Sequence, residues 1–171
     1  MPGTLITKEQ LEYDKNRIYS LGLFNEVQLQ TVPTSDSKAT IVVQLSERWY
    51  IYPYPIVGIK DRDWGKLYYG LGLLHMNFRG RNEKLATSFV VGYDPSLSLF
   101  YRNPFLTEEG IYSLEARLTL NTIRNKSLQA TLTSGDASFD ERHYTLMLSF
   151  GKRFGIHHTA WFSTGYEVIN V

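Results

Sequence analysis

Few side chains in this sequence are spaced for catalysis or metal binding. His157 and His158 are adjacent, so in a strand their imidazoles would point to opposite faces and could not share a metal ion. Asp61 and Asp63, followed by Gly65, resemble the start of a calcium loop, but the acidic ligand needed at its twelfth position is missing. Cysteine is absent, which removes thiolate nucleophiles and disulfides. We therefore predict no enzyme activity, no metal site and no cofactor.

Composition narrows the class of protein only in part. The 171 residues are 43% hydrophobic with a net charge of +1, so they can bury a core but carry no field that would recruit nucleic acid. No window approaches the roughly 18 consecutive apolar residues of a membrane helix. The first ten residues, MPGTLITKEQ, lack the basic and apolar regions of an export signal. If the protein is exported, we expect this chain to be a fragment of it.

The elements that would position any site are dominated by alternating strands. In residues 112–120 every second residue is apolar, which is typical of a strand whose two faces meet different media. The apolar positions, which we predict to face lipid, are Tyr112, Leu114, Ala116, Leu118 and Leu120. The intervening positions, which we predict to face a wet lumen, include Glu115, Arg117 and Thr119.

Turn residues divide the second part of the chain into about seven segments of this kind. We expect strands at 50–60, 66–78, 83–93, 96–105, 111–123, 139–154 and 157–170. Their connections would alternate between two ends, as an antiparallel up-and-down meander requires. Membrane strands need about 9–11 residues whereas soluble strands average nearer 5 or 6, so these lengths favour part of a transmembrane β-barrel.

The first part of the chain has a different pattern. Residues 7–22 predict a helix, with Thr7 as its N-cap, Gln10 completing a capping box and Gly22 in a left-handed turn at its end. Residues 24–32 and 38–49 predict a hairpin of two strands. A helix and two strands bury little, so residues 1–49 are interpreted as the C-terminal part of a small α+β module, and 50–171 as an incomplete barrel.

The order of these features resembles the last POTRA module and the opening barrel strands of outer-membrane assembly factors of the BamA/TamA type (bacterial surface antigen barrels). Residues 21–24, Leu-Gly-Leu-Phe, with Val27 and a strand ending in Glu47, are similar to the POTRA close. Asn-Phe-Arg-Gly-Arg-Asn at 77–82 resembles the N-x-x-G-x-G turn between the second and third barrel strands, with Asn82 in place of the second glycine. Arg-Asn-Pro-Phe at 102–105 matches the N-P-[FY] end of the fourth strand.

The resemblance implies a bacterial outer-membrane protein whose N-terminal part lies in the periplasm. It implies a barrel of roughly sixteen strands, within the known range, that inserts or translocates other proteins without covalent chemistry. Its partners would be client outer-membrane or secreted proteins, accessory periplasmic or lipoprotein subunits, and the lipid bilayer. In this family the first barrel strand parts from the last and opens a lateral seam at which an incoming client strand pairs.

One stretch of the sequence points to that seam independently. Pro53 and Pro55 are two residues apart, so in a strand their missing N–H groups would lie on the same edge and weaken its pairing. The candidate seam residues are Tyr52, Pro53, Tyr54, Pro55 and Ile56. The alternative is that residues 52–55 form only an extended linker after the α+β module.

A second alternative concerns the whole chain. The same strands could form a soluble, lipocalin-like barrel that encloses a small ligand, with the apolar rows facing the cavity. The two interpretations place Glu115 and Arg117 on opposite sides of the barrel wall.

Overall fold

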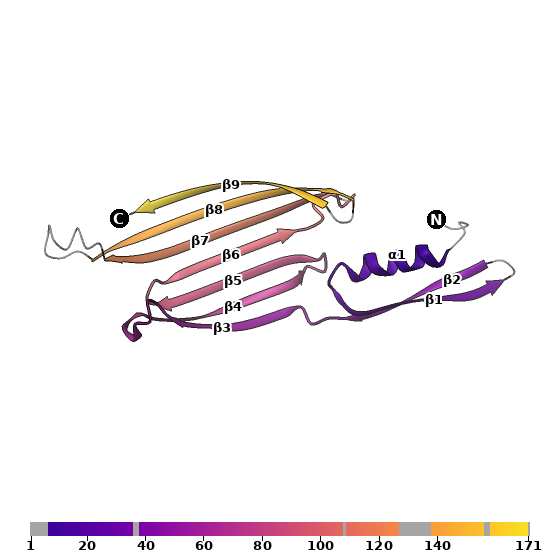
Figure 1. Ribbon diagram of the computed structural model, residues 1–171, viewed down its shortest axis with the longest axis horizontal. Helices are drawn as coiled ribbons and strands as arrows, with labels where there is room; N and C mark the ends of the chain where they lie inside the picture. The colour runs from indigo at the N-terminus through magenta and orange to yellow at the C-terminus, as the bar shows by residue number, and fades with distance from the viewer. Residues whose placement is uncertain (1–6, 36–37, 108, 127–137, 156–157, 171) are drawn as a thin grey trace. The chain divides into compact units, whose positions relative to one another are not determined.

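The computed structural model describes residues 7–35, 38–107, 109–126, 138–155 and 158–170. These residues form one α-helix, one 3-10 helix and nine strands in two antiparallel sheets, so the predicted mainly β class is confirmed (Figure 1). The chain divides into two compact units, Met1–Tyr50 and Ile51–Val171. None of the described helices has the length and apolar character required to cross a bilayer.

The first unit begins with helix α1, Lys8–Tyr19. The backbone N–H of Gln10 donates to Thr7 Oγ1 at 3.2 Å, so the predicted N-cap is confirmed. The helix ends at Ser20, and Gly22 then takes a φ of +71°, the left-handed conformation expected there. Both ends of the helix are therefore determined by residues within or next to it.

Strands β1, Phe24–Ser35, and β2, Lys38–Glu47, form the hairpin that follows. Helix α1 contacts β1, with Leu11, Ile18 and Leu21 half-buried and Val27 only 3% exposed. Every residue of β2 is exposed, including Ile41 and Val43. The helix therefore covers a small core over β1 and leaves β2 without a covering layer within the described residues.

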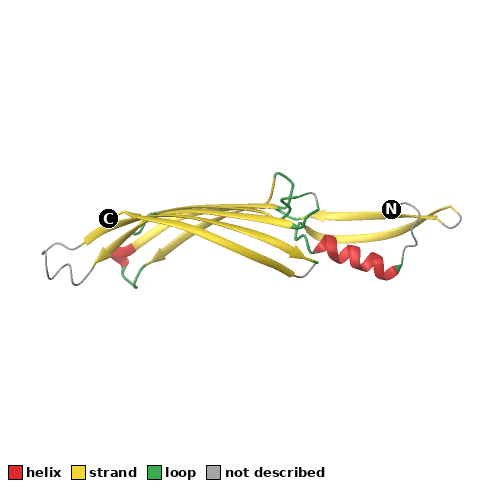
Figure 2. Cartoon of the chain, turned by 90° about the horizontal axis from the view of Figure 1, so that it is seen from above, coloured by secondary structure: helices red, strands yellow, loops and turns green. Residues whose placement is uncertain are grey.

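The second unit is a seven-stranded antiparallel sheet in which every strand pairs with its neighbours in sequence. The strands are β3 Ile51–Ile59, β4 Leu67–Phe78, β5 Glu83–Gly92, β6 Ser96–Asn103, β7 Tyr112–Lys126, β8 Ser138–Phe154 and β9 His158–Asn170. The meander is thus confirmed, and each strand end lies within three residues of its predicted position. The strands fan out from one another in Figure 2, which is the twist that chiral backbones impose on open sheets.

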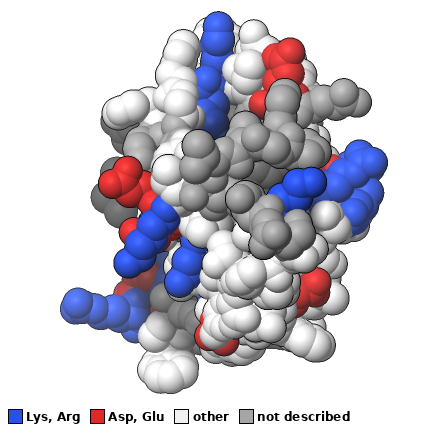
Figure 3. All heavy atoms as spheres, turned by 90° about the vertical axis from the view of Figure 1, so that its right-hand side faces the viewer, with Lys and Arg blue, Asp and Glu red and all other residues white. Residues whose placement is uncertain are grey.

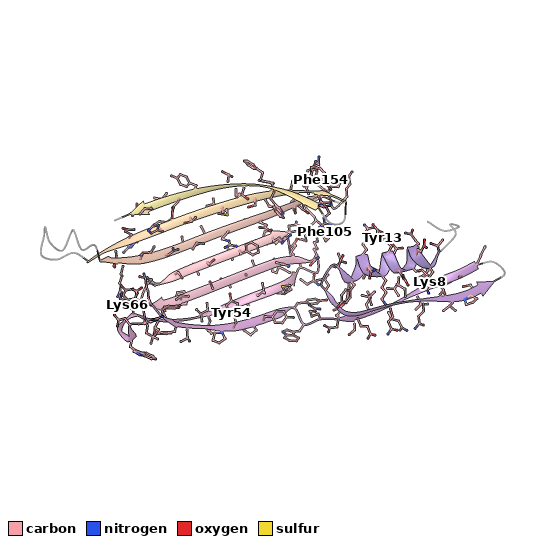
Figure 4. The ribbon with its side chains drawn as sticks, in the orientation of Figure 1. Lys8, Tyr13, Tyr54, Lys66, Phe105 and Phe154 are labelled. Atoms are coloured by element: carbon pink, nitrogen blue, oxygen red, sulfur yellow. The ribbon has the colours of Figure 1, made fainter. Side chains whose placement is uncertain are left out.

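Connections between the strands lie alternately at the two ends of the sheet (Figure 1). The 3-10 helix η1, Trp64–Lys66, lies in the β3–β4 connection, where Asp63 Oδ1 accepts the N–H of Gly65 at 2.9 Å. Figure 4 labels Lys66 at this end of the sheet and Phe105 and Phe154 at the other. Parts of the β6–β7, β7–β8 and β8–β9 connections lie outside the described residues.

Charged residues of both signs are interspersed on the side of the molecule that Figure 3 presents. This mixture agrees with the net charge of +1.

Candidate functional site

Strand β3 lies at one edge of the seven-stranded sheet and pairs only with β4. The pairing runs without a register shift from Ile51 opposite His75 to Ile59 opposite Leu67. Residues 52–55 therefore belong to a regular strand, and the prediction of an extended linker at these positions is wrong. The other edge of the sheet is β9.

The two prolines of β3 lie on its outer edge. Lys60 N–H donates to the carbonyl of Lys66 at 3.1 Å, which makes these two residues a hydrogen-bonded pair just beyond the ladder. Hydrogen-bonded and non-hydrogen-bonded pairs alternate in an antiparallel ladder, so the even-numbered residues of β3 bond to β4. Pro53, Pro55 and Val57 consequently turn their backbone groups outward. Across the two prolines this edge offers carbonyl acceptors without N–H donors.

The opposite edge of β3 is held to β4 by aromatic rings that lie over glycines. Tyr54 is opposite Gly72, and Tyr68 is opposite Gly58. A Cβ atom built on either glycine would overlap the ring of its tyrosine, so both glycines are required for this close packing. Figure 4 labels Tyr54 on β3. The candidate seam strand therefore has one tightly packed edge and one edge that is poor in donors.

Charged groups fasten the connection that follows β3. Lys60 pairs with Asp94, and Lys66 pairs with Asp61. The hydrogen bond to Asp94 raises the pKa of Lys60, and the hydrogen bond from Lys66 lowers the pKa of Asp61. Both lysines lie over the ring of Tyr93, at 5.4 and 5.6 Å from its centroid. The two aspartates that resembled the start of a calcium loop stabilise the turn between β3 and β4. Asp61 forms an ion pair with Lys66, and Asp63 is the N-cap of the 3-10 helix η1.

The two faces of the sheet differ across strands β6 to β9. Register places Leu99, Leu118, Leu146 and Tyr166 in one cross-strand row, and Ser98, Thr119, Thr145 and Glu167 in the next. Successive residues of a strand point to opposite faces, so each row belongs to one face. We call them the apolar face and the polar face. The predicted lipid-facing residues of β7 all lie on the apolar face, and Glu115, Arg117 and Thr119 all lie on the polar face.

Burial distinguishes the faces further. Ser113 and Ser149, on the polar face, are 6% and 7% exposed, whereas Leu71 and Phe162, on the apolar face, are 70% and 69% exposed. This is the burial pattern of a sheet that curves toward its polar face. A soluble ligand-binding barrel needs its apolar rows on the inner side, so the pattern argues against the lipocalin-like alternative.

Polar side chains meet across strands on the polar face. Arg102 Nε lies 3.2 Å from Glu115 Oε1, and the Arg102 guanidinium stacks 5.4 Å from the Trp161 ring. His143 bridges two carboxylates, with Nε2 3.1 Å from Glu141 and Nδ1 3.0 Å from Glu167. Glu115, Trp161 and Glu167 lie on other strands than their partners, so sequence reasoning did not find these contacts. Glu141 is two residues from His143 on β8, and its contact was missed as well.

The β4–β5 turn contains a further ion pair that sequence reasoning missed. Glu83 is 0% exposed, and both its carboxylate oxygens accept hydrogen bonds of 2.9 Å from Arg79, which also donates to Tyr101 Oη at 3.1 Å. Asn82 takes a φ of +58°, and its N–H donates to Asn77 Oδ1 at 2.7 Å. Asparagine tolerates this left-handed conformation better than most residues, which explains how it replaces the second glycine of the turn pattern.

Transmembrane barrels carry tyrosines and tryptophans on the lipid-facing side near both ends of their strands, in an arrangement called an aromatic belt. Only some of the aromatic residues near strand ends here lie on the apolar face. Tyr112 and Tyr144 lie on the apolar face at opposite ends of the sheet, as a belt predicts. Tyr52 and Tyr68 lie on the polar face.

His157, one of the two adjacent histidines, lies outside the described residues.

Comparison with known proteins bears on the fold. No protein-family model and no curated protein matches the sequence. Among solved structures, the chain is similar to the crystal structure of BamA from Haemophilus ducreyi lacking POTRA domains 1-3, with a TM-score of 0.66 and 17% sequence identity. The match covers 98% of this chain and 30% of the BamA chain, so this chain spans less than a third of the length of the BamA chain.

The likeness concerns the fold of the chain. This chain, with its open seven-stranded sheet, has a fold similar to part of that BamA structure. At 17% identity the comparison establishes the fold alone. The identification of residues 1–49 as part of a POTRA module remains a prediction.

Proposed function

We propose that this chain is part of an outer-membrane barrel that assembles or translocates other proteins, with β3 as the strand that receives client strands. The observation that carries the proposal is the outer edge of β3, where Pro53 and Pro55 remove donors from an otherwise regular strand. The exposed apolar face supports a bilayer as its surroundings. The fold likeness to BamA supports the same class of activity.

The mechanism we propose is strand pairing without covalent chemistry. A client strand in extended conformation would add to the outer edge of β3 by backbone hydrogen bonds, as at any exposed sheet edge. Opposite residues 53 and 55 it would find acceptors only, so the pairing would be incomplete and reversible. The inner edge of β3 would stay attached to β4, because Tyr54 and Tyr68 pack closely over their glycines.

The N-terminal unit would supply recruitment in this proposal. A helix packed on one strand of a hairpin, with β2 exposed, suits a POTRA-type module that offers strand surface to periplasmic partners. Residues 1–49 would then lie in the periplasm and the sheet in the outer membrane. Client proteins and accessory subunits would be its protein partners.

A crosslinking experiment tests the seam. Because the chain has no cysteine, single-cysteine variants can carry a photoreactive group without background. Val57 is on the outer edge of β3 and 74% exposed, and Val91 lies in the same cross-strand row on interior strand β5. In cells, a probe at Val57→Cys should form adducts with newly made outer-membrane proteins, whereas one at Val91→Cys should not. Equal adduct yields at the two positions would contradict the proposal.

Replacing both prolines tests the mechanism separately. The Pro53→Val, Pro55→Val variant restores two N–H donors to the outer edge, so clients should remain bound longer. A pulse-chase measurement of the Val57 adduct would show slower loss of the client. Client release at the unaltered rate would mean that the missing donors have no part in the exchange.

A further inference from the structure

A hollow of about 320 Å³ lies on the apolar face, near the end of the sheet where β5 turns into β6. Its lining belongs to three adjacent cross-strand rows. The first row, on the apolar face, consists of Phe89, Leu97, Leu120 and Tyr144. The second, also on the apolar face, contains Pro95, Thr122 and Arg142, with Thr122 N–H bonded to the Pro95 carbonyl at 2.9 Å.

The row between these two forms the floor of the hollow. It consists of Val90, Ser96, Asn121 and His143. Their side chains alternate to the polar face, so they contribute backbone to the hollow. The walls are therefore four large apolar or aromatic side chains on one side and a small Thr122 and a cationic Arg142 on the other.

Arg142 is a cation at an apolar-face position of the ladder, as are Arg124 on β7 and Lys152 on β8. No carboxylate of the described residues forms an ion pair with it, whereas Arg124, on the neighbouring strand β7, pairs with Asp140. Arg142 is exposed and opposite Thr122 in the ladder, so its guanidinium and the Thr122 hydroxyl can serve one ligand. A guanidinium of this kind matches phosphate through paired N–H donors.

Arg142 also lies at one boundary of the apolar face. On β8 the apolar positions run from Tyr144 to Phe150, with Arg142 before them and Lys152 after them. Ten residues at about 3.4 Å each, tilted by about 45°, span about 24 Å, close to the roughly 25 Å apolar band of membrane barrels. Lys152 lies over the rings of Tyr112 and Phe154, at 6.0 and 5.5 Å. The two cations thus mark the levels at which lipid headgroups would lie.

We propose that this hollow binds a phosphate-bearing membrane lipid. One acyl chain would lie against Phe89, Leu97, Leu120 and Tyr144, while the phosphate accepts hydrogen bonds from Arg142 and Thr122. The site rests on the proposed function to the extent that the apolar face must contact a bilayer. The site would add one specific contact, at the level of the lipid headgroups on one side of the bilayer. The rest of the apolar face would contact hydrocarbon without such specificity.

Lipid retention by the full-length protein in detergent tests the site. The probes are phosphatidylglycerol and a diacylglycerol with the same acyl chains but no phosphate, counted by native mass spectrometry. Arg142→Gln should lower phosphatidylglycerol retention about fivefold, the factor expected for one basic residue at an anionic lipid. The control is Arg153→Gln, which removes a cation on the polar face of the same strand and should leave retention unchanged.

Two further variants keep the test decisive. Arg142→Lys retains the charge but loses the paired donors, so its retention should fall between wild type and Arg142→Gln. Thr122→Trp fills the hollow and should lower retention of both lipids. Equal retention by Arg142→Gln and wild type, or equal retention of the two lipids by wild type, would overturn the site. Either result in a membrane-embedded protein leaves the assembly function standing, whereas absence of membrane embedding would remove both proposals.

Discussion

The two faces of the seven-stranded sheet are built from the same strands but by different rules. On the polar face, side chains interlock in specific pairs, such as Arg102 with Glu115 and Tyr54 over Gly72. On the apolar face, residues such as Leu71 and Phe162 remain largely exposed. On the polar face, packing therefore depends on the shapes and positions of the particular side chains that meet. On the other face, large apolar side chains such as these have little contact with the rest of the described residues.

The substitution expected to change stability most is one that places a charge on the apolar face. Leu118→Arg should lower the free energy of unfolding by about 2–4 kcal/mol, the cost of an arginine at the middle of a bilayer. Thr119→Arg changes the adjacent residue on the polar face, where water is accessible, and should change stability by less than about 0.5 kcal/mol. Urea titration of both variants in lipid vesicles provides the measurement. Equal costs at the two positions would mean that the faces do not meet different media.

A smaller effect sharpens the account of the polar face. Gly72→Val would overlap the Tyr54 ring and should cost about 1–3 kcal/mol by overpacking. Leu71→Val, the neighbouring change on the apolar face, removes one methylene and should cost less than about 1 kcal/mol. The same titration measures both.

A double variant identifies the cause of that cost. Adding Tyr54→Ala to Gly72→Val removes the ring with which the valine collides, so part of the lost stability should return. If the two single effects simply add, the overlap with Tyr54 is not the reason for the destabilisation.

The smallest expected effect concerns an ion pair outside both faces, in a connection between strands. Asp61 lies in the β3–β4 connection, and its hydrogen bond from Lys66 lowers its pKa below the ordinary 3.8. A lowered pKa means that the pair contributes stability above pH 3.8 and loses it as the pH falls through the folded-state value. Carboxyl chemical shifts followed by NMR should show the Asp61 midpoint rising toward 3.8 in Lys66→Met. A midpoint unaffected by this substitution would show that the ion pair does not form in solution.

Local features of the fold could be predicted because local chemistry produces them. Thr7 caps α1 and Gly22 follows its end in the left-handed conformation, as their residue types require. The strands of the sheet begin and end near their predicted positions, because alternation and turn residues act over a few neighbours. The assignment of Glu115 and Arg117 to the face opposite Leu118 follows from the same alternation.

The candidate sites depended on contacts that no local pattern encodes. The pair of Pro53 and Pro55 drew attention to β3, but only the ladder showed that both face away from β4. Arg142 interrupts the apolar positions of β8, which the sequence shows, but the hollow beside it is formed by residues of four strands. The buried Glu83 and Tyr101 both accept hydrogen bonds from Arg79, yet they are on different strands and have no common motif.

By itself the sequence determined that residues 50–171 form two-faced strands, since side chains alternate along any extended backbone. Only the tertiary structure decided the register that sets Tyr54 over Gly72, the outward edge of the prolines and the curvature toward the polar face. The physical reason is one of range. Alternation is a property of a single strand, whereas register and curvature depend on how all the strands hydrogen-bond and how large their facing side chains are.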